Sequence, residues 1–490
     1  MVILFKKGDR SECGNYRGIS LLSTAGKILA RVLLNRILAN ITDNVIPESQ
    51  SGFRAGRGTV DMIFSLRQIQ EKCVEQQMPL FVMFIDFTKA FDTVGREGLW
   101  ELLKKFGCPT HFVSMVRELH ADMNGLVSHN SELSAPFKIT NGVKQGCALA
   151  PTLFSIFLTA ALFEATRELD DTGIMLRFRS DGGLFNLARL RAKTKVSSVL
   201  IRELLYADDS AFLAHSRDDL QLIADRFAAA CRLYGLTINL KKTEVLYQPS
   251  PGEHYVDPVQ SPVITIEGSQ LKAVTEFTYL GSTVSCDARL DKEIETRISK
   301  ACAAFGRLRQ RLWCNQHLTV RTKCAAYRAI ILSILLYGCE SWAIYRAQIN
   351  RLSVLQMRHL RFIMGLTLLD RVPNEEILRH ANMPGIETII MKSQLRWCGH
   401  VRRMHDSRLP KALLYGELAT GARKIGRPRL RYKDTIKYKV NRCKLQDWER
   451  TALNREQWRS TLRLGAERFE QARLEHQRAT RERRRNQQRL

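Results

Sequence analysis

Three aspartates combine a residue type and a position that suit metal chemistry. Asp86 directly follows Leu80–Ile85, a continuous apolar run of strand length, and Asp208 and Asp209 lie together between two short apolar runs. A carboxylate at a strand end is also a common turn residue. However, a cluster of carboxylates on neighbouring strands repels itself and takes up protons unless a cation neutralises it.

Hard carboxylate oxygens are the ligands that Mg²⁺ prefers, with water and substrate phosphate completing its shell. Two such ions about 4 Å apart activate an attacking hydroxyl and hold the leaving oxygen in an in-line displacement. The three aspartates therefore predict a phosphoryl or nucleotidyl transferase with two Mg²⁺ ions, for which Mn²⁺ could substitute. The alternative is that they only form turns.

The cysteines do not form a second metal site by spacing. The chain has 12 cysteines, and none are spaced as in a zinc hairpin. Cys398, His400 and His405 come closest to a cluster, but they lack a clear fourth ligand. We expect reduced thiols in an intracellular protein.

The charge balance predicts a polyanionic partner. The chain carries 76 Lys and Arg against 49 Asp and Glu, a net charge of +27, which is typical of nucleic-acid-binding proteins. Residues 421–490 hold 22 basic and 8 acidic residues, a net +14. Four aromatic residues in this tail could stack on unpaired bases, namely Tyr432, Tyr438, Trp448 and Trp458. The alternative is a solvated helix surface with these aromatics on its core side.

Length and composition favour an intracellular protein of two to four domains with a substantial core. The chain has 490 residues, of which 45% are hydrophobic. The longest apolar stretches, 149–163 and 329–344, are shorter than the ~18 residues of a membrane span. No secretory signal is visible, because the apolar run at 2–5 ends at two lysines.

Hydrophobic periodicity predicts alternating helices and strands in the first 285 residues and helices after residue 287. The expected helices are 21–41, 59–73, 96–106, 109–123, 151–168 and 217–234. The expected strands are 80–85, a hairpin around Asp208-Asp209, and 236–247. Residues 170–194 have weak periodicity and resemble an insertion or a flexible strand pair, and 249–262 resemble a loop. Arg297 falls on the charged side of the helix that follows 287, and the end of the chain resembles a frayed basic helix.

Seven segments resemble the motifs of reverse transcriptases, in the family's order. Residues 84–92 (FIDFTKAFD) resemble motif A, 141–147 (NGVKQGC) motif B, 206–209 (YADD) motif C, 235–243 (GLTINLKKT) motif D and 279–282 (YLGS) motif E. Residues 15–22 and 52–59 resemble the fingers motifs. The motifs are similar to those of non-LTR (LINE) retrotransposons, and 395–404 with Gly426-Arg427-Pro428 resemble the RTE-like branch. The N-terminal endonuclease of intact relatives is not visible.

The resemblance implies a role for individual residues. Asp86, Asp208 and Asp209 match the catalytic metal ligands, together with the carbonyl of Phe87. Phe91 matches the aromatic that selects dNTP over rNTP, and Gln145 and Gly146 match the pair along the nascent base pair. Lys6 and Arg17 match the cations that grip the triphosphate. Lys242 matches a lysine that protonates the leaving pyrophosphate.

The expected fold is an α+β right-hand polymerase, with fingers and an antiparallel palm sheet in 1–285, a helical thumb in 286–370 and a basic α-helical region in 371–490. The expected function is RNA-directed DNA polymerisation, with an RNA template, a DNA primer or target and dNTPs as partners. The alternatives are an inactive retrotransposon remnant that only binds nucleic acid, and a maturase-like or viral RNA polymerase. Nuclear or cytoplasmic localisation follows from the resemblance alone.

Overall fold

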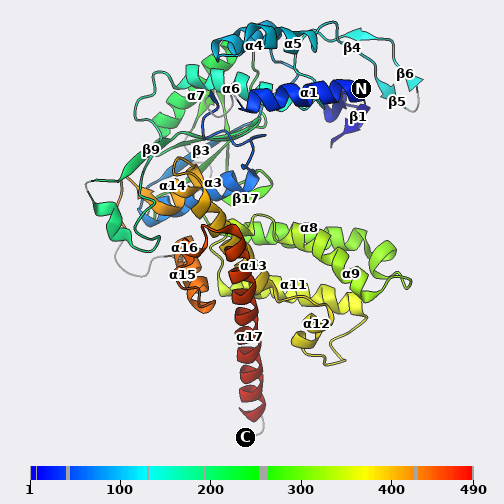
Figure 1. Ribbon diagram of the computed structural model, residues 1–490, viewed down its shortest axis with the longest axis vertical. Helices are drawn as coiled ribbons and strands as arrows, with labels where there is room; N and C mark the ends of the chain where they lie inside the picture. Colours follow the sequence, from blue (N-terminus) through cyan, green and yellow to red (C-terminus); the bar gives the residue numbers. More distant parts are fainter. Residues whose placement is uncertain are drawn as a thin grey trace.

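The computed structural model describes residues 2–6, 8–39, 45–129, 132–192, 194–252, 263–423 and 429–487. A strand-rich part lies beside a layer of helices, and the last helix, α17 (Arg455–Gln487), extends away from both (Figure 1). The Gly426-Arg427-Pro428 motif and most of the predicted 249–262 loop lie outside the described residues. None of the helices in these ranges has the length and apolarity needed to cross a membrane.

A five-stranded sheet forms the centre of the strand-rich part, in the order β10-β11-β3-β12-β15. Neighbouring strands run antiparallel except β12 and β15, which are parallel. The strands are β3 (Leu80–Ile85), β10 (Glu203–Tyr206), β11 (Asp209–Ala214), β12 (Glu244–Gln248) and β15 (Lys272–Val274). The predicted strand at 80–85 and the predicted hairpin at the Asp-Asp pair are both confirmed.

Both faces of this sheet are covered, as the unbroken apolar sequence of β3 predicts. Phe81, Met83 and Ile85 belong to one core, which also contains residues of α6 (Ala150–Thr166) and α7 (Arg217–Leu233). The alternate residues of β3 belong to a second core with α3 (Thr59–Glu75). The helices predicted at 59–73, 151–168 and 217–234 are thereby confirmed, and they hold β3 rigidly between two layers.

The N-terminal part places a small sheet and several helices along one end of the central sheet (Figure 1). Strands β1 (Val2–Phe5) and β2 (Tyr16–Ile19) pair in antiparallel register. Helix α1 (Thr24–Ile37) begins later than predicted because the Ser23 hydroxyl accepts a hydrogen bond from the Gly26 N–H. Helix α4 spans Arg96–Lys105. Helix α5 (Thr110–Glu118) is shorter than predicted, and Asp122 beyond it has a left-handed φ of 41°.

Short strand pairs complete the strand-rich part. They are β4 (Asn124–Gly125) with β7 (Phe137–Lys138), β13 (Thr265–Ile266) with β14 (Ser269–Gln270), and β16 (Glu276–Tyr279) with β17 (Ser282–Ser285). Strands β5 (Ser128–His129) and β6 (Glu132–Leu133) instead extend the N-terminal sheet, in the order β2-β1-β5-β6. The β16–β17 turn contains the Tyr-Leu-Gly-Ser motif.

Of the two alternatives for residues 170–194, the strand pair is confirmed in part, because the range contains one strand that pairs with the segment just after it. Strand β8 (Ile174–Phe178) is the middle strand of a three-stranded sheet between β9 (Ser197–Ile201) and β18 (Gly416–Leu418). Ile174 and Leu176 are fully buried. One partner strand, β18, lies more than two hundred residues away in the sequence.

The strand predicted over 236–247 begins only at Glu244. Residues 236–243 instead run across the end of β3, where the Thr88 N–H donates to Thr237 O at 2.9 Å and the Asn239 N–H donates to Asp86 O at 2.8 Å. This segment therefore holds the backbone that follows β3.

The helical layer has its own core, which includes Ile294, Trp313, Tyr327, Leu352 and Leu360. Its helices are α8 (Asp291–Arg307), α9 (Val320–Ala326), α10 (Leu332–Leu335), α11 (Arg346–Met364) and α12 (Asn374–His380). The predicted exposure of Arg297 is wrong. Its side chain is buried, 2.9 Å from the Glu293 carboxylate, because this helix face packs against the strand-rich part rather than against water.

The C-terminal region folds into helices and one strand, and its last helix continues to Gln487, the last described residue. It consists of α13 (Ile386–Arg403), α14 (Leu409–Tyr415), β18, α15 (Tyr432–Arg442), α16 (Trp448–Thr451) and α17. Tyr432, Trp448 and Trp458 are buried in a core shared with Phe64 of α3. The prediction that they stack on bases is therefore wrong, because these aromatics form the apolar side of the C-terminal helices. Tyr438 remains exposed.

Candidate active site

The sheet register brings two of the predicted aspartates together. Ser210 of β11 pairs with Ile85 of β3 in antiparallel register. The next position on each strand therefore places Asp209 opposite Asp86. This arrangement follows from the antiparallel pairing of two strands that are more than one hundred residues apart in the sequence.

The third aspartate lies on the adjoining turn. Tyr206 of β10 pairs with Asp209, so Ala207 and Asp208 are the two residues between the paired positions. Asp208 is thus one residue from Asp209 and lies at the same end of the sheet. All three predicted metal ligands are on β11, on the turn before it or directly after β3.

The pKa values of Asp208 and Asp209 are raised because these carboxyls are buried close to other negative charges. Burial raises the pKa of Asp209 to about 6, and the charges of Asp208 and Asp86 add to this effect. Burial likewise raises the pKa of Asp208, with a further contribution from Asp86. The site disfavours its own negative charge and would gain from a bound cation.

Asp86 provides the clearest candidate ligand atom. Its Oδ2 atom is shielded from water and has no hydrogen-bond partner in the part of the chain that the structure describes. The Lys242 ammonium lies 3.2 Å from the same oxygen, close enough for an ion pair but outside hydrogen-bond geometry. The Lys242 side chain is 66% exposed. A weakly held ammonium therefore occupies the position where the carboxylate needs positive charge.

These residues partly form a metal centre. Within the described ranges, no group of three or more His, Cys, Asp or Glu side chains converges as a complete ligand set. Asp86 nevertheless has a buried oxygen whose contact with Lys242 is an ion pair without hydrogen-bond geometry, and Asp208 lies close enough to Asp86 for the two negative charges to repel each other. Both features fit a divalent cation whose other ligands are backbone, water and substrate oxygens. The Phe87 backbone, which directly follows Asp86, forms an isolated bridge to Ile238.

The two predicted N-terminal cations are in electrostatic range of the turn. Arg17 on β2 pairs with Leu4 of β1, and Lys6 directly follows β1. Arg17 and, to a smaller extent, Lys6 oppose the upward shift of the Asp208 pKa. Both side chains are exposed. The small N-terminal sheet thus turns two positive groups toward the acidic cluster.

The motif B residues lie between this sheet and the residues after β3. Gln145 donates from Nε2 to Asp92 Oδ1 at 2.9 Å, and its carbonyl accepts from the Ser20 N–H at 2.8 Å. Gly146 has φ 105°, and a Cβ there would meet Ser20 O at 2.6 Å. The structure therefore gives Gly146 a packing role against the end of β2. Asp92, which orients the Gln145 amide, was not singled out by sequence, because exposed aspartates are common.

Phe91 is half-buried. Its ring lies 4.6 Å from that of Phe154 on α6, and its carbonyl accepts from the Val143 N–H at 2.8 Å. Phe91 thus connects the segment after β3 to motif B and rests on the helix that begins there. This position is consistent with the sugar-selecting role that the resemblance implies, and equally with a core aromatic.

The Cys398, His400 and His405 cluster does not form a metal site in the described residues. Cys398 is buried and lies 3.5 Å from the Tyr432 hydroxyl. The His405 ring contacts Ser407. Cys398 is part of the C-terminal core, as expected for a reduced structural thiol.

Comparisons with known proteins agree with the positions of these motifs. Residues 5–284 match the family model described as "Reverse transcriptase (RNA-dependent DNA polymerase)". The "Probable RNA-directed DNA polymerase from transposon BS" of Drosophila melanogaster is 27% identical over 423 residues, which is 84% of this chain and 43% of the relative. The "RNA-directed DNA polymerase from mobile element jockey" of the same species is 25% identical over 74% of this chain and 37% of the relative.

The chain thus spans about two fifths of the length of these relatives. Among solved structures, a telomerase from Candida Tropicalis in complex with a TWJ fragment of telomeric RNA has a TM-score of 0.37 and 14% sequence identity. That match covers 80% of this chain and 56% of the telomerase chain.

Proposed function

Because this chain belongs to the reverse transcriptase (RNA-dependent DNA polymerase) family, we propose that it synthesises DNA on an RNA template by two-metal nucleotidyl transfer. The acidic end of the central sheet is the observation that carries the proposal: Asp209 lies opposite Asp86, Asp208 is on the adjoining turn, and a buried Asp86 oxygen has no hydrogen-bond partner among the described residues. The partners are an RNA template, a DNA primer or target, and dNTPs.

The proposal assigns a right-hand polymerase arrangement. Residues 1–285 form the fingers and palm, 286–370 the thumb and 371–490 the basic C-terminal region. The separate cores of the strand-rich part and the helical layer support a boundary near residue 286. The division at residue 371 does not separate two cores, because the core of the C-terminal region includes Phe64 of α3. It marks the basic region of the chain.

Asp86 and Asp208 would hold two Mg²⁺ ions together with the Phe87 carbonyl, and Asp209 would act from the periphery. When bound, such ions lower the pKa of a primer 3′-hydroxyl and neutralise the charge that develops on the phosphoryl oxygens and the pyrophosphate. Mn²⁺ has similar ligand preferences and could substitute. The 3′ oxygen attacks the α-phosphorus of the dNTP, and the bond to pyrophosphate breaks.

The remaining residues bind and orient the substrate. Arg17 and Lys6 would grip the triphosphate, the former through a bidentate guanidinium and the latter as a point charge. Gln145 would present its amide, held by Asp92, to the nascent base pair. Lys242 would leave its ion pair with Asp86 and donate its proton to the departing pyrophosphate.

The relatives' names and the segment at 395–404 support a non-LTR retrotransposon origin, and we assign the chain to an RTE-like branch. The proposal covers polymerisation and assigns no target-cleaving activity to these residues. Because insertion requires chromosomal DNA, access to the nucleus as well as the cytoplasm is part of the proposal.

Primer extension tests this function directly. The full chain, an RNA template with an annealed DNA primer, dNTPs and Mg²⁺ should give an extended product whose added segment resists alkaline hydrolysis, as DNA does and RNA does not. Template binding without extension would support the nucleic-acid-binding remnant instead.

Replacing Phe91 with alanine should relax sugar selection. We expect the ratio of rNTP to dNTP incorporation to rise roughly tenfold or more, because the ring would no longer crowd the 2′ position. Single-nucleotide incorporation with each substrate measures the ratio.

The Phe106→Ala variant is the matched control for this substitution, since Phe106 is a half-buried aromatic packed against the same core. It should leave the ratio unchanged. If Phe91 is only a core residue, its loss should cost ~3–5 kcal/mol of stability and reduce both activities alike.

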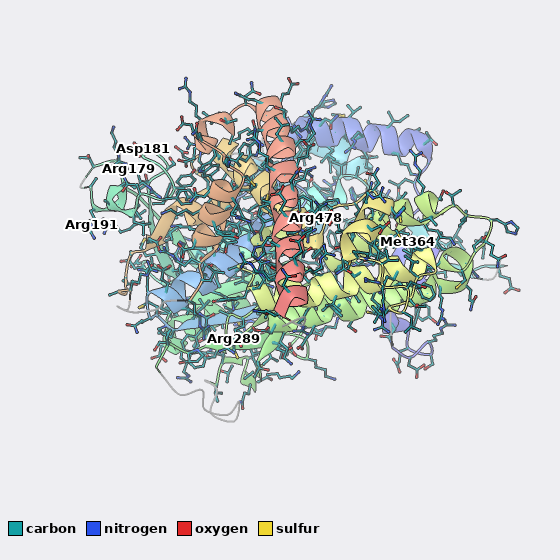
Figure 2. All side chains as sticks on the ribbon, turned by 90° about the horizontal axis from the view of Figure 1, so that it is seen from below. Arg179, Asp181, Arg191, Arg289, Met364 and Arg478 are labelled. Atoms are coloured by element: carbon teal, nitrogen blue, oxygen red, sulfur yellow. The ribbon has the colours of Figure 1, made fainter. Side chains whose placement is uncertain are left out.

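The exposed arginines of α17 should contribute to RNA binding. Figure 2 shows this helix with Arg478 on it, and Arg478 pairs with Glu375 of α12. Glutamine at the exposed Arg459, Arg463 and Arg468 should weaken binding at low salt. The slope of log affinity against log salt should flatten by roughly 0.7–0.9 for each phosphate that the protein no longer neutralises.

The control for this prediction replaces three exposed arginines of α7 with glutamine, namely Arg217, Arg226 and Arg232. It removes the same formal charge from another surface. Equal slopes for the α17 and α7 variants would mean that the α17 arginines are only solvated surface charge.

A further inference from the structure

The side-chain amide of Gln50 is hydrogen-bonded to the backbone of the turn that carries Asp208. Its Oε1 accepts from the Ala207 N–H at 2.9 Å and from the Gly52 N–H at 2.8 Å. Its Nε2 donates to the Ala207 carbonyl at 3.2 Å. Gln50 is fully buried. One side chain thus bonds both the N–H and the carbonyl of the residue that precedes Asp208.

Ala207 needs such support because its backbone is strained. Its φ of 58° lies in the left-handed region, which a residue with a Cβ rarely adopts. Strained backbone persists only where the surroundings enforce it. Rotation at Ala207 would redirect the following Asp208 carboxylate, so the Gln50 amide fixes the direction of a metal ligand.

The residues beside Gln50 hold the same hairpin. The Leu205 N–H donates to Ser49 O at 2.8 Å, and the Ser51 N–H donates to Leu205 O at 2.9 Å. A Cβ at Gly52 would meet Ala207 N at 2.2 Å. Only glycine allows residues 49–52 to lie this close to the turn.

The C-terminal region anchors this segment from its other side. Arg408, which directly precedes α14, donates to a Glu48 carboxylate oxygen and to Asp61 Oδ1, the latter at 3.1 Å. It also donates to Gly56 O at 3.4 Å. The side chains of Arg408, Glu48 and Asp61 are 12%, 20% and 4% exposed, so these ion pairs are largely shielded from water. Arg408 thereby ties the C-terminal region to both ends of the 48–61 segment.

We propose that Gln50 is a positioning residue that fixes the Ala207–Asp208 turn for metal binding, and that Arg408 holds Gln50 in place from the C-terminal region. The consequence for catalysis rests on the proposed polymerase function. The effect of Gln50 on the turn does not rest on that function, because it can be measured without substrate.

The first test compares hydrogen exchange of residues 204–210 in wild type, Gln50→Ala and Gln356→Ala. Gln356 is the matched control, since it is also buried and also bonds backbone groups, Pro384 O and the Ile386 N–H, but in the helical layer. Gln50→Ala should accelerate exchange of 204–210 by about tenfold, equivalent to about 1.4 kcal/mol of local opening. Gln356→Ala should leave it unchanged.

The second test measures Mn²⁺ affinity by electron paramagnetic resonance in the same three proteins. Gln50→Ala should weaken Mn²⁺ binding several-fold, and the Mg²⁺ concentration for half-maximal activity should rise in step. A purely structural loss would lower the active fraction without moving either midpoint. Gln356→Ala should behave in this second way.

Two further variants keep the test decisive if Gln50→Ala does not fold. Gln50→Glu preserves size but sets a carboxylate oxygen against Ala207 O, and should loosen the turn in the same direction. Arg408→Gln should do so to a smaller extent, whereas Arg473→Gln, which breaks the similarly shielded pair with Glu470, should not. Unchanged exchange and Mn²⁺ affinity in folded Gln50 variants would overturn the inference. If these two properties changed in the Gln50 variants but the wild type were inactive, the positioning role of Gln50 would be supported and the polymerase proposal would be contradicted.

Discussion

Replacing Asp208 with asparagine is expected to lower nucleotide incorporation by about 10³-fold or more. Asparagine keeps the shape of the side chain but removes the negative charge that would hold a metal ion against the α-phosphate, and electrostatic groups of this kind account for losses of this order. The rate of single-nucleotide incorporation at saturating Mg²⁺ measures the effect.

The same substitution should not destabilise the fold. Burial raises the pKa of Asp208 above its usual value. A carboxyl with a raised pKa destabilises the folded protein when it ionises, so Asp208 lowers the free energy of unfolding at neutral pH. The neutral amide should leave the melting temperature unchanged or slightly higher. Asp218→Asn is the control, since its side chain is 89% exposed on α7. If Asp208→Asn kept activity within a few-fold of wild type, Asp208 could not be a catalytic metal ligand.

Deleting residues 421–490 is expected to unfold the protein rather than merely remove a nucleic-acid-binding tail. The deletion removes the buried Tyr432, Trp448 and Trp458 and exposes Phe64 of α3. Removing a single large aromatic from a core costs ~3–5 kcal/mol, so the loss of three is comparable to the whole of the roughly 5–15 kcal/mol by which domains are usually stable. The yield of soluble protein and its thermal unfolding measure this outcome.

A shorter deletion, of residues 475–490, supplies the control because it begins beyond Phe469, the last buried aromatic of α17 among the described residues. It should keep a melting temperature within a few degrees of wild type. A soluble 421–490 deletion with cooperative unfolding at the wild-type temperature would show that the C-terminal region is an independent appendage.

The sequence predicted the strand-rich part well because its signals are local. The apolar run at 80–85, the paired aspartates at 208–209 and the helix stopped by Gly235 each depend on neighbouring residues, and the structure places them as expected. The candidate site was predictable for the same reason, since carboxylates at the ends of apolar strands stand out.

The sequence could not reveal features that depend on distant partners. The pairing of β8 with β18 is one of them, because the two strands lie more than two hundred residues apart in the chain. The C-terminal aromatics resembled stacking residues because nothing in their neighbourhood predicts contact with Phe64. Gln50 carries no signal at all, since a glutamine acquires its role only when Ala207 adopts a left-handed backbone beside it.

The most direct test of the polymerase proposal is templated single-nucleotide incorporation by the full chain. Four RNA templates that differ only in the first unpaired base after a DNA primer are each offered the four dNTPs and the four rNTPs with Mg²⁺. The proposal predicts that each template directs addition of its complementary dNTP, and that EDTA abolishes the reaction. Binding of all four templates without any addition, or addition of rNTPs as readily as dNTPs, would contradict it.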